Sequence, residues 1–153
     1  MDKLKVLPSG NGVLMSLVGL GGVSAGIGFM TGPDGSKLGM SVDLLEKSPF
    51  DDFVIPGIVL LIIIGFGSLF GAFLSFKGHR YAGLLSMGIG LFLILWILAQ
   101  AYWIGWVSWL QPIFLLIGAT EMLLGYCLND EYTPKKGKFW KFPDDLYDFW
   151  MYQ

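Results

Sequence analysis

Glu121 is the residue of this chain with the clearest chemical potential, because it is an acidic side chain inside the long apolar segment 108–127. A carboxyl group in hydrocarbon is costly unless it is paired, protonated or hydrated, so Glu121 is a candidate proton or cation site. Lys77, His79 and Arg80, at the cytoplasmic ends of the second and third segments, are the basic residues that could reach towards it. Four arrangements are open: a buried ion pair with Lys77 or Arg80, a protonated acid bonded to a backbone carbonyl, a coupling carboxylate in a conduction path, or a side chain that reaches the headgroups.

Gln100 and Gln111 flank the predicted turn between the third and fourth apolar segments, on the outer side of the membrane, and we expect their amides to hydrogen-bond to each other and fix a hairpin. The aromatic residues around them are typical of a belt at the membrane interface: Tyr102, Trp103, Trp106 and Trp109. A quinone, lipid or haem pocket is the alternative, although the single histidine, His79, cannot supply paired axial ligands within one chain. The sequence therefore predicts no cofactor.

One loop collects acidic residues that could hold a cation: Asp43, Glu46, Asp51 and Asp52. Calcium would require about six to eight oxygen ligands, and the spacing of an EF-hand is missing. Helix capping is the simpler explanation. We expect Ser41 to cap a short helix over 42–46, and Ser48 and Pro49 to be the cap and first residue of the next helix. Asp51 and Asp52 would then complement the dipole of that helix, and no metal site is predicted.

The composition excludes an ordinary soluble domain. Hydrophobic residues make up 54% of the 153 residues and charged residues 14%, against roughly 45–50% and about 25% in soluble proteins. A membrane helix needs about 20 apolar residues, and four segments qualify: 12–30, 52–76, 81–104 and 108–127. We predict an all-α integral membrane protein, a four-helix bundle of two hairpins with a short interfacial helix in its outer loop. Residues 1–128 form this domain, and residues 129–153 form an aromatic and charged cytoplasmic tail.

Lysine and arginine residues fall mainly on one side of the predicted spans: Lys3, Lys5, Lys77, Arg80, Lys135, Lys136, Lys138 and Lys141. The other side has Lys37 and Lys47, which acidic residues outnumber. By the positive-inside rule, both termini are expected in the cytoplasm. A cleaved signal peptide is the alternative for the N-terminus, because Lys3 and Lys5 precede an apolar stretch, but residues 8–12 separate the two.

The tail places cations and rings together over residues 135–142, which suits an anionic membrane surface. Further along, Leu146, Phe149 and Trp150 would share one helical face. We expect that face to cover the membrane, the base of the bundle or a partner protein. Nucleic acid is not an expected partner, because the acidic residues that follow cancel the basic charge.

Small residues recur at helical spacing in two of the spans, where they allow close contact between helices. Gly19, Gly22 and Gly26 form a stripe in the first span. The second span repeats the pattern with Gly67, Gly71 and Ser75. We therefore expect a close contact between these two helices. In the fourth span, a stripe that includes Gly118 and Gly125 should turn Glu121 towards a neighbouring helix.

Two stretches of the chain carry a pattern beyond composition. The first is residues 38–45 with Ser48, Pro49 and Phe50, followed by Ile55, Pro56 and Gly57. The second is Trp96, Gln100, Ile104, Gly105, Ser108, Leu110, Gln111 and Pro112. Together they resemble a family of small four-span bacterial membrane proteins of unassigned function. The resemblance covers roughly residues 12–125 and implies a four-helix fold, with no activity to carry over.

The function expected from these patterns is that of a small accessory or scaffold protein of the bacterial inner membrane, without catalytic activity. It would assemble through its glycine-lined helix faces with copies of itself or with a membrane partner protein, among membrane lipids. The alternative is a small homo-oligomeric transporter or channel in which Glu121 is the coupling carboxylate.

Overall fold

The computed structural model describes residues 3–132, and within that range every regular element is helical. The α-helices are α1 (Lys3–Thr31), α2 (Val54–Val59), α3 (Gly67–Phe76), α4 (Ala82–Trp103) and α5 (Leu110–Tyr132). Two short 3₁₀ helices, η1 (Ser36–Leu38) and η2 (Val42–Leu45), lie in the loop after α1. A π-helical segment, η3 (Leu60–Phe66), joins α2 to α3. The predicted tail, apart from its first four residues, lies outside the described residues.

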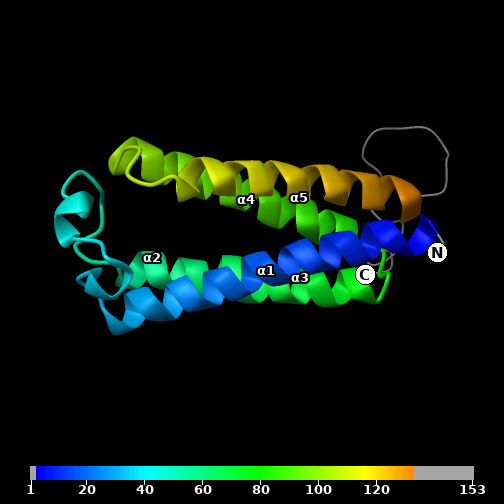
Figure 1. The fold of residues 1–153 in the computed structure, drawn as a ribbon, viewed down its shortest axis with the longest axis horizontal. Coiled ribbons are helices and arrows are strands. Elements are labelled where there is room, and N and C mark those ends of the chain that lie inside the picture. The colour runs from blue at the N-terminus through cyan, green and yellow to red at the C-terminus, as the bar shows by residue number, and fades with distance from the viewer. Residues whose placement is uncertain (1–2, 133–153) are drawn as a thin grey trace, which may run out of the picture.

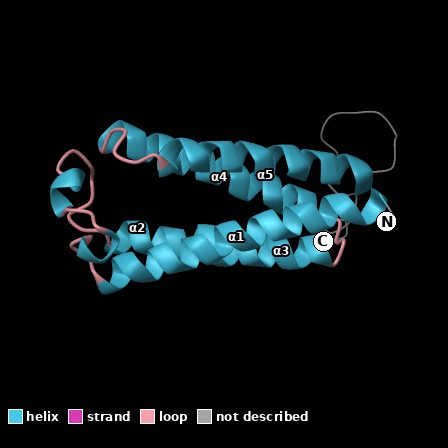
Figure 2. Ribbon diagram, in the orientation of Figure 1, coloured by secondary structure: helices cyan, strands magenta, loops and turns pink. Residues whose placement is uncertain are grey.

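The helices form two antiparallel hairpins (Figure 1), one of α1 with α2, η3 and α3, and the other of α4 with α5. The start of α1, the α3–α4 link and the end of α5 lie at one end of the bundle, which we call the terminal end. The loop with η1 and η2 and the α4–α5 turn lie at the other, the loop end (Figure 2). The four segments Val6–Thr31, Val54–Phe76, Ala82–Trp103 and Leu110–Glu131 are long and apolar enough to cross a membrane. The predicted four-helix membrane fold is confirmed.

Three helix boundaries differ from the sequence prediction. Helix α1 begins at Lys3 and runs through Pro8, so the residues expected to separate the lysines from the apolar stretch are helical. Pro8 is the sixth residue of α1, so it lacks the N–H group that would bond to the carbonyl of Leu4, and α1 does without that intrahelical bond. The second span begins at Val54 instead of Pro49, and Ser48 accepts a local hydrogen bond from the Phe50 amide. Helix α5 continues to Tyr132, beyond the predicted end at residue 127.

The predicted close contact between the first two spans is formed. A β-carbon on Gly22 would lie 2.8 Å from the backbone nitrogen of Gly65, and one on Gly26 would lie 2.8 Å from the carbonyl oxygen of Gly57. Gly19 packs in the same way against the Leu69 side chain. The glycine stripe of α1 therefore lies directly on the backbone of the second span.

The expected partner stripe on the second span is only partly right. Gly71 does face α1, where it packs against Met15. Gly67 instead faces α4, and a β-carbon placed there would lie 2.8 Å from the Cδ1 atom of Ile89. The glycines that receive the α1 stripe are Gly57 and Gly65, which the sequence pattern did not single out.

The α4–α5 hairpin is closed by two glycine pairs. A β-carbon on Gly83 would lie 2.6 Å from the carbonyl oxygen of Gly125, and one on Gly90 would lie 2.6 Å from that of Gly118. Both pairs are backbone-to-backbone contacts, so neither helix can move away from a new side chain without separating from its partner. Glu121 lies between the two pairs along α5.

Side chains fill the space between the two hairpins. In the middle of the bundle Val18 and Ile64 pack with Leu93 and Ile97 of α4. At the loop end Phe29 stacks on Phe53 at 4.8 Å between ring centroids, and these two rings form a buried cluster with Leu45 of η2.

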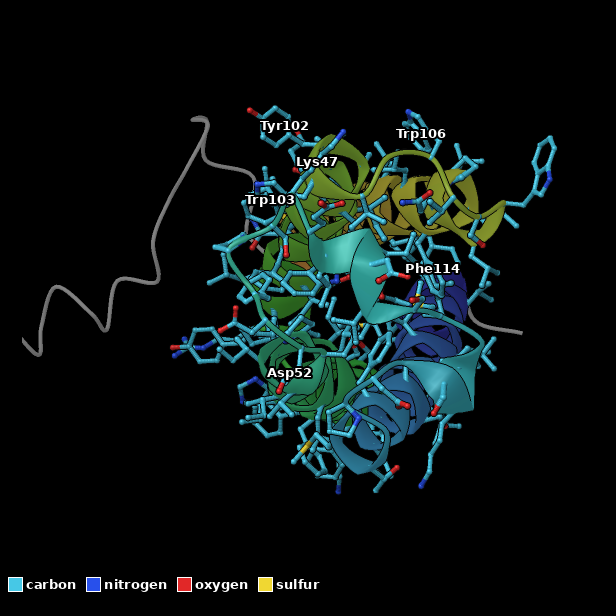
Figure 3. The ribbon with its side chains drawn as sticks, turned by 90° about the vertical axis from the view of Figure 1, so that its left-hand side faces the viewer. Lys47, Asp52, Tyr102, Trp103, Trp106 and Phe114 are labelled. Carbon is cyan, nitrogen blue, oxygen red and sulfur yellow. The ribbon has the colours of Figure 1, made fainter. Side chains whose placement is uncertain are left out.

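Figure 3 looks onto the loop end, where η2 lies across the middle of the bundle and Tyr102 and Trp106 point outward. Ser41 accepts the backbone N–H of Asp43 at 3.3 Å, which confirms it as the cap of this short helix. The outer loop thus packs on the loop end of the bundle through Leu45.

Candidate functional site

Each of the four spans places one fully buried polar side chain near the terminal end: Asn11 (α1), Ser75 (α3), Ser86 (α4) and Glu121 (α5). All four are 0% exposed. We call them the polar cluster. Buried polar groups in hydrocarbon are costly and mark candidate functional sites, so this cluster is the strongest candidate in the described part of the chain.

Hydrogen bonds connect the cluster across both hairpins. The Asn11 amide nitrogen donates to the Ser75 hydroxyl at 2.9 Å. The Ser86 hydroxyl lies 2.9 Å from the Asn11 amide oxygen and 2.9 Å from the backbone carbonyl oxygen of Glu121. A serine hydroxyl has one proton, so Ser86 donates to one of these two acceptors at a time. Asn11 therefore joins its own hairpin to the other one.

The carboxyl group of Glu121 is enclosed without a hydrogen-bond partner. Neither of its oxygens is bonded to any described residue. Its β-carbon lies 3.0 Å from the position that a β-carbon of Gly90 would take, so the glycine contact between α4 and α5 holds this part of the side chain closely. Only the backbone carbonyl of the residue takes part in the bonded network of the cluster.

The structure does not bring Lys77 or Arg80 to Glu121. The Lys77 ammonium lies over the Phe73 ring, 5.6 Å from its centroid. The Arg80 guanidinium lies 4.8 Å from the Tyr81 ring and donates to the Tyr81 hydroxyl at 3.0 Å. The predicted ion pair and the predicted bond from a protonated carboxyl to a backbone carbonyl are both wrong for the described residues. Both cations turn instead to aromatic rings at the exposed end of the bundle.

Sequence reasoning missed the role of Asn11, because it assigned residues 8–12 to a segment before the first span. The signal was present, since an asparagine four residues before Met15 lies on the same helical face as a core methionine. Ser75 was included only as a small packing residue, and Ser86 was not considered.

Two further polar atoms, the Ser68 hydroxyl and the Trp96 indole nitrogen, are buried without a hydrogen-bond partner in the described region.

Gln111 does fix the α4–α5 turn, but through the backbone and not through Gln100. Its amide oxygen accepts the N–H groups of Val107 at 3.0 Å and Ser108 at 3.3 Å. Its amide nitrogen donates to the carbonyl of Gly105 at 3.0 Å. The predicted bond between the two glutamines is absent from the described residues, because Gln111 uses both ends of its amide on the turn beside it.

Replacing Gln111 by alanine should lower the free energy of unfolding by about 1–3 kcal/mol, because three hydrogen bonds to a turn are lost together. Gln100→Ala is the matched control. Its side chain makes no hydrogen bond with the described residues, so its effect should stay within about 0.5 kcal/mol. Unfolding in mixed micelles, followed by tryptophan fluorescence, measures both. Equal effects of the two variants would contradict this role of Gln111.

The acidic outer loop makes local hydrogen bonds. Asp52 accepts the amide of Val54, the first residue of α2, at 2.9 Å, although the N-cap position of that helix is Phe53. Asp34 accepts the amide and the hydroxyl of Ser36, and these two bonds lower the pKa of its carboxyl. Among the described residues, no group of three or more histidine, cysteine or acidic residues could hold a metal ion.

Comparisons of the chain with models of protein families, with curated proteins and with solved structures found no match.

Proposed function

We propose that this membrane protein is a small transporter or channel of the bacterial inner membrane in which Glu121 binds and releases a proton as the coupling carboxylate. The observation that carries the proposal is the enclosure of the Glu121 carboxyl, 0% exposed and without a partner among the described residues, beside a network from all four spans. The protein has no catalytic role in this proposal.

The accessory or scaffold function expected from the sequence has less support. It relied on glycine-lined faces that would bind another subunit. Gly22 and Gly26 are packed against the second span of the same chain, and Gly118 and Gly125 against α4. These faces are therefore already occupied within the chain. Assembly into a homo-oligomer would have to use other surfaces.

Through the polar cluster, proton binding at Glu121 can affect how the two hairpins pack against each other. An unpartnered carboxylate in hydrocarbon costs about 2.5–3.5 kcal/mol or more, so the neutral acid is the form that suits the closed bundle. To release the proton, the carboxylate needs donors. None of the other side chains of the cluster is bonded to the carboxyl: Asn11 donates to Ser75, and Ser86 donates to Asn11 or to the backbone carbonyl of Glu121. Proton release therefore requires the bonds between the hairpins to rearrange or water to enter.

The proposed orientation places the terminal end in the cytoplasm. Lys77 and Arg80 are exposed there in the α3–α4 link, and the outer loop with its acidic residues lies at the opposite end. The positive-inside rule favours this arrangement. A maleimide that cannot cross the membrane should then label the α3–α4 link only after cells are opened, once a cysteine has been introduced by His79→Cys and Cys127 replaced by serine.

Glu121→Gln should reduce proton flux at least tenfold in liposomes that contain the purified protein. Glutamine has nearly the same shape as glutamate, but its amide does not bind and release a proton near neutral pH. Flux is followed with an enclosed pH-sensitive dye after a potassium diffusion potential is applied. Thr120→Val is the matched control, because the neighbouring Thr120 is exposed and bonds only to the Leu116 carbonyl of its own helix, at 2.7 Å.

The two functions give different results in this experiment. Flux in the wild type that Thr120→Val retains and Glu121→Gln loses, with both variants monodisperse, supports coupling by Glu121. Flux that Glu121→Gln leaves unchanged removes this residue from the mechanism. Wild-type liposomes that conduct no better than empty ones contradict transport, and a stoichiometric partner that copurifies in mild detergent would then favour the accessory function.

A further inference from the structure

An open groove runs along the outside of the bundle between α3 and α4, near the terminal end. Its volume is about 510 Å³, which lies within the range of roughly 300–1,000 Å³ for ligand pockets. Its walls are apolar, and the two helices supply most of them: Phe70, Leu74, Leu84, Leu85 and Gly88. The side chains of His79 and Tyr81, from the α3–α4 link, line its end. A groove of this kind accepts a hydrocarbon chain.

Two cationic side chains, Lys77 and Arg80, belong to the α3–α4 link, from which His79 and Tyr81 line the groove. Tyr81, a lining residue, is in direct contact with Arg80, whose guanidinium lies 4.8 Å from the centre of the tyrosine ring. Lys77 lies in the same exposed link, three residues before Arg80, with its ammonium over Phe73. A guanidinium has five N–H donors, which suits it to bind a phosphate while it also contacts the tyrosine.

We infer that this groove binds an anionic phospholipid from the surrounding bilayer, with an acyl chain along α3 and α4 and the phosphate at Lys77 and Arg80. The combination of an apolar channel and a cationic end is complementary to a molecule with an apolar chain and an anionic head. Basic sites beside membrane helices bind anionic headgroups on this principle. The inference depends on the membrane fold and is independent of proton transport.

Gly88 gives a direct test of where the acyl chain of the lipid lies. A β-carbon placed on Gly88 would meet nothing within 4 Å, although the residue lines the groove. Gly88→Leu therefore places a side chain in the groove from a position where its β-carbon meets no protein atom, and it also improves helix propensity. Gly21→Leu is the matched control, because Gly21 of α1 also has nothing within 4 Å and lies outside the groove.

The experiment is native mass spectrometry of the full chain in mild detergent, titrated with phosphatidylglycerol or with phosphatidylcholine of the same acyl chains. We expect the wild type and Gly21→Leu to bind phosphatidylglycerol at least tenfold more tightly than phosphatidylcholine. Gly88→Leu should weaken phosphatidylglycerol binding about tenfold. Lys77→Gln combined with Arg80→Gln should remove the preference for the anionic lipid, whereas Lys47→Gln, at the loop end, should keep it.

The opposite results are equally definite. Equal binding of the two lipids by the wild type, or unchanged binding by Gly88→Leu, would overturn the inference. A dimer that Gly88→Leu abolishes would assign the groove to a second copy of the chain and would overturn it as well. Because the readout is lipid binding, the inference can fail while proton flux persists, and it can hold in a protein that carries no flux.

Discussion

Gly125→Leu should lower the free energy of unfolding of the bundle by about 3 kcal/mol, which is more than a hundredfold in the ratio of folded to unfolded protein. Even the β-carbon of the new side chain would lie 2.6 Å from the carbonyl oxygen of Gly83 and 2.8 Å from the backbone nitrogen of Met87. Neither atom can turn aside, because both belong to the backbone of α4. The α4–α5 hairpin must therefore open along its length.

The same substitution at an open glycine isolates the cause. Gly21→Leu introduces an identical side chain into α1 at a position with nothing within 4 Å. Leucine favours the helix over glycine by up to about 1 kcal/mol, so this control should be neutral or slightly more stable than the wild type. Unfolding in mixed micelles measures the free energy of unfolding of both variants. If both variants were equally stable, the close approach of α4 and α5 would be refuted.

Asn11→Ala should lower the free energy of unfolding by about 2–3 kcal/mol. Asn11 is 0% exposed, donates to Ser75 and is one of the two acceptors within reach of the Ser86 hydroxyl, so alanine removes the bond to Ser75 and that acceptor, and leaves a cavity between the hairpins. The Ser75 hydroxyl loses its donor. Ser86 keeps the Glu121 carbonyl as an acceptor, which limits the damage on that side.

Ser24→Ala is the control for the loss of a polar group from α1. Ser24 is exposed and donates only to the Leu20 carbonyl of its own helix, at 2.8 Å, so its removal should change stability by less than about 0.5 kcal/mol. A double-mutant cycle of Asn11→Ala with Ser75→Ala should give a coupling energy of at least about 0.5 kcal/mol. Additive effects of the two substitutions would show that the bond does not contribute to stability.

The sequence predicted the features that hydrocarbon and helix geometry impose locally. The length of a bilayer fixes the length of a span, so four apolar segments were enough to predict four helices. The stripe of Gly19, Gly22 and Gly26 was predictable because spacing along one helix defines a face. The surface of the second span that this stripe packs against was not predictable. The π-helical segment Leu60–Phe66 has a wider turn than an α-helix, so regular spacing cannot assign the faces of the second span.

The candidate site was predicted only in part for a similar reason. Glu121 was identified because a carboxylate in an apolar segment is unusual wherever the helix faces. Its neighbours depend on where α1 begins and on how the two hairpins meet, which are properties of the three-dimensional packing. Lys77 and Arg80 lie at the expected end of the bundle, but nearby rings attract them, and spacing alone does not show this competition.

The glycine contacts within each hairpin have a consequence for biosynthesis. Each hairpin is closed by contacts between its own two spans. Gly22 contacts Gly65 in the first hairpin, and Gly83 contacts Gly125 in the second. The first hairpin is thus complete at residue 76, before the ribosome has made the second. We expect the two halves to enter the bilayer in order of translation and to dock afterwards, with the bond between Asn11 and Ser86 formed last.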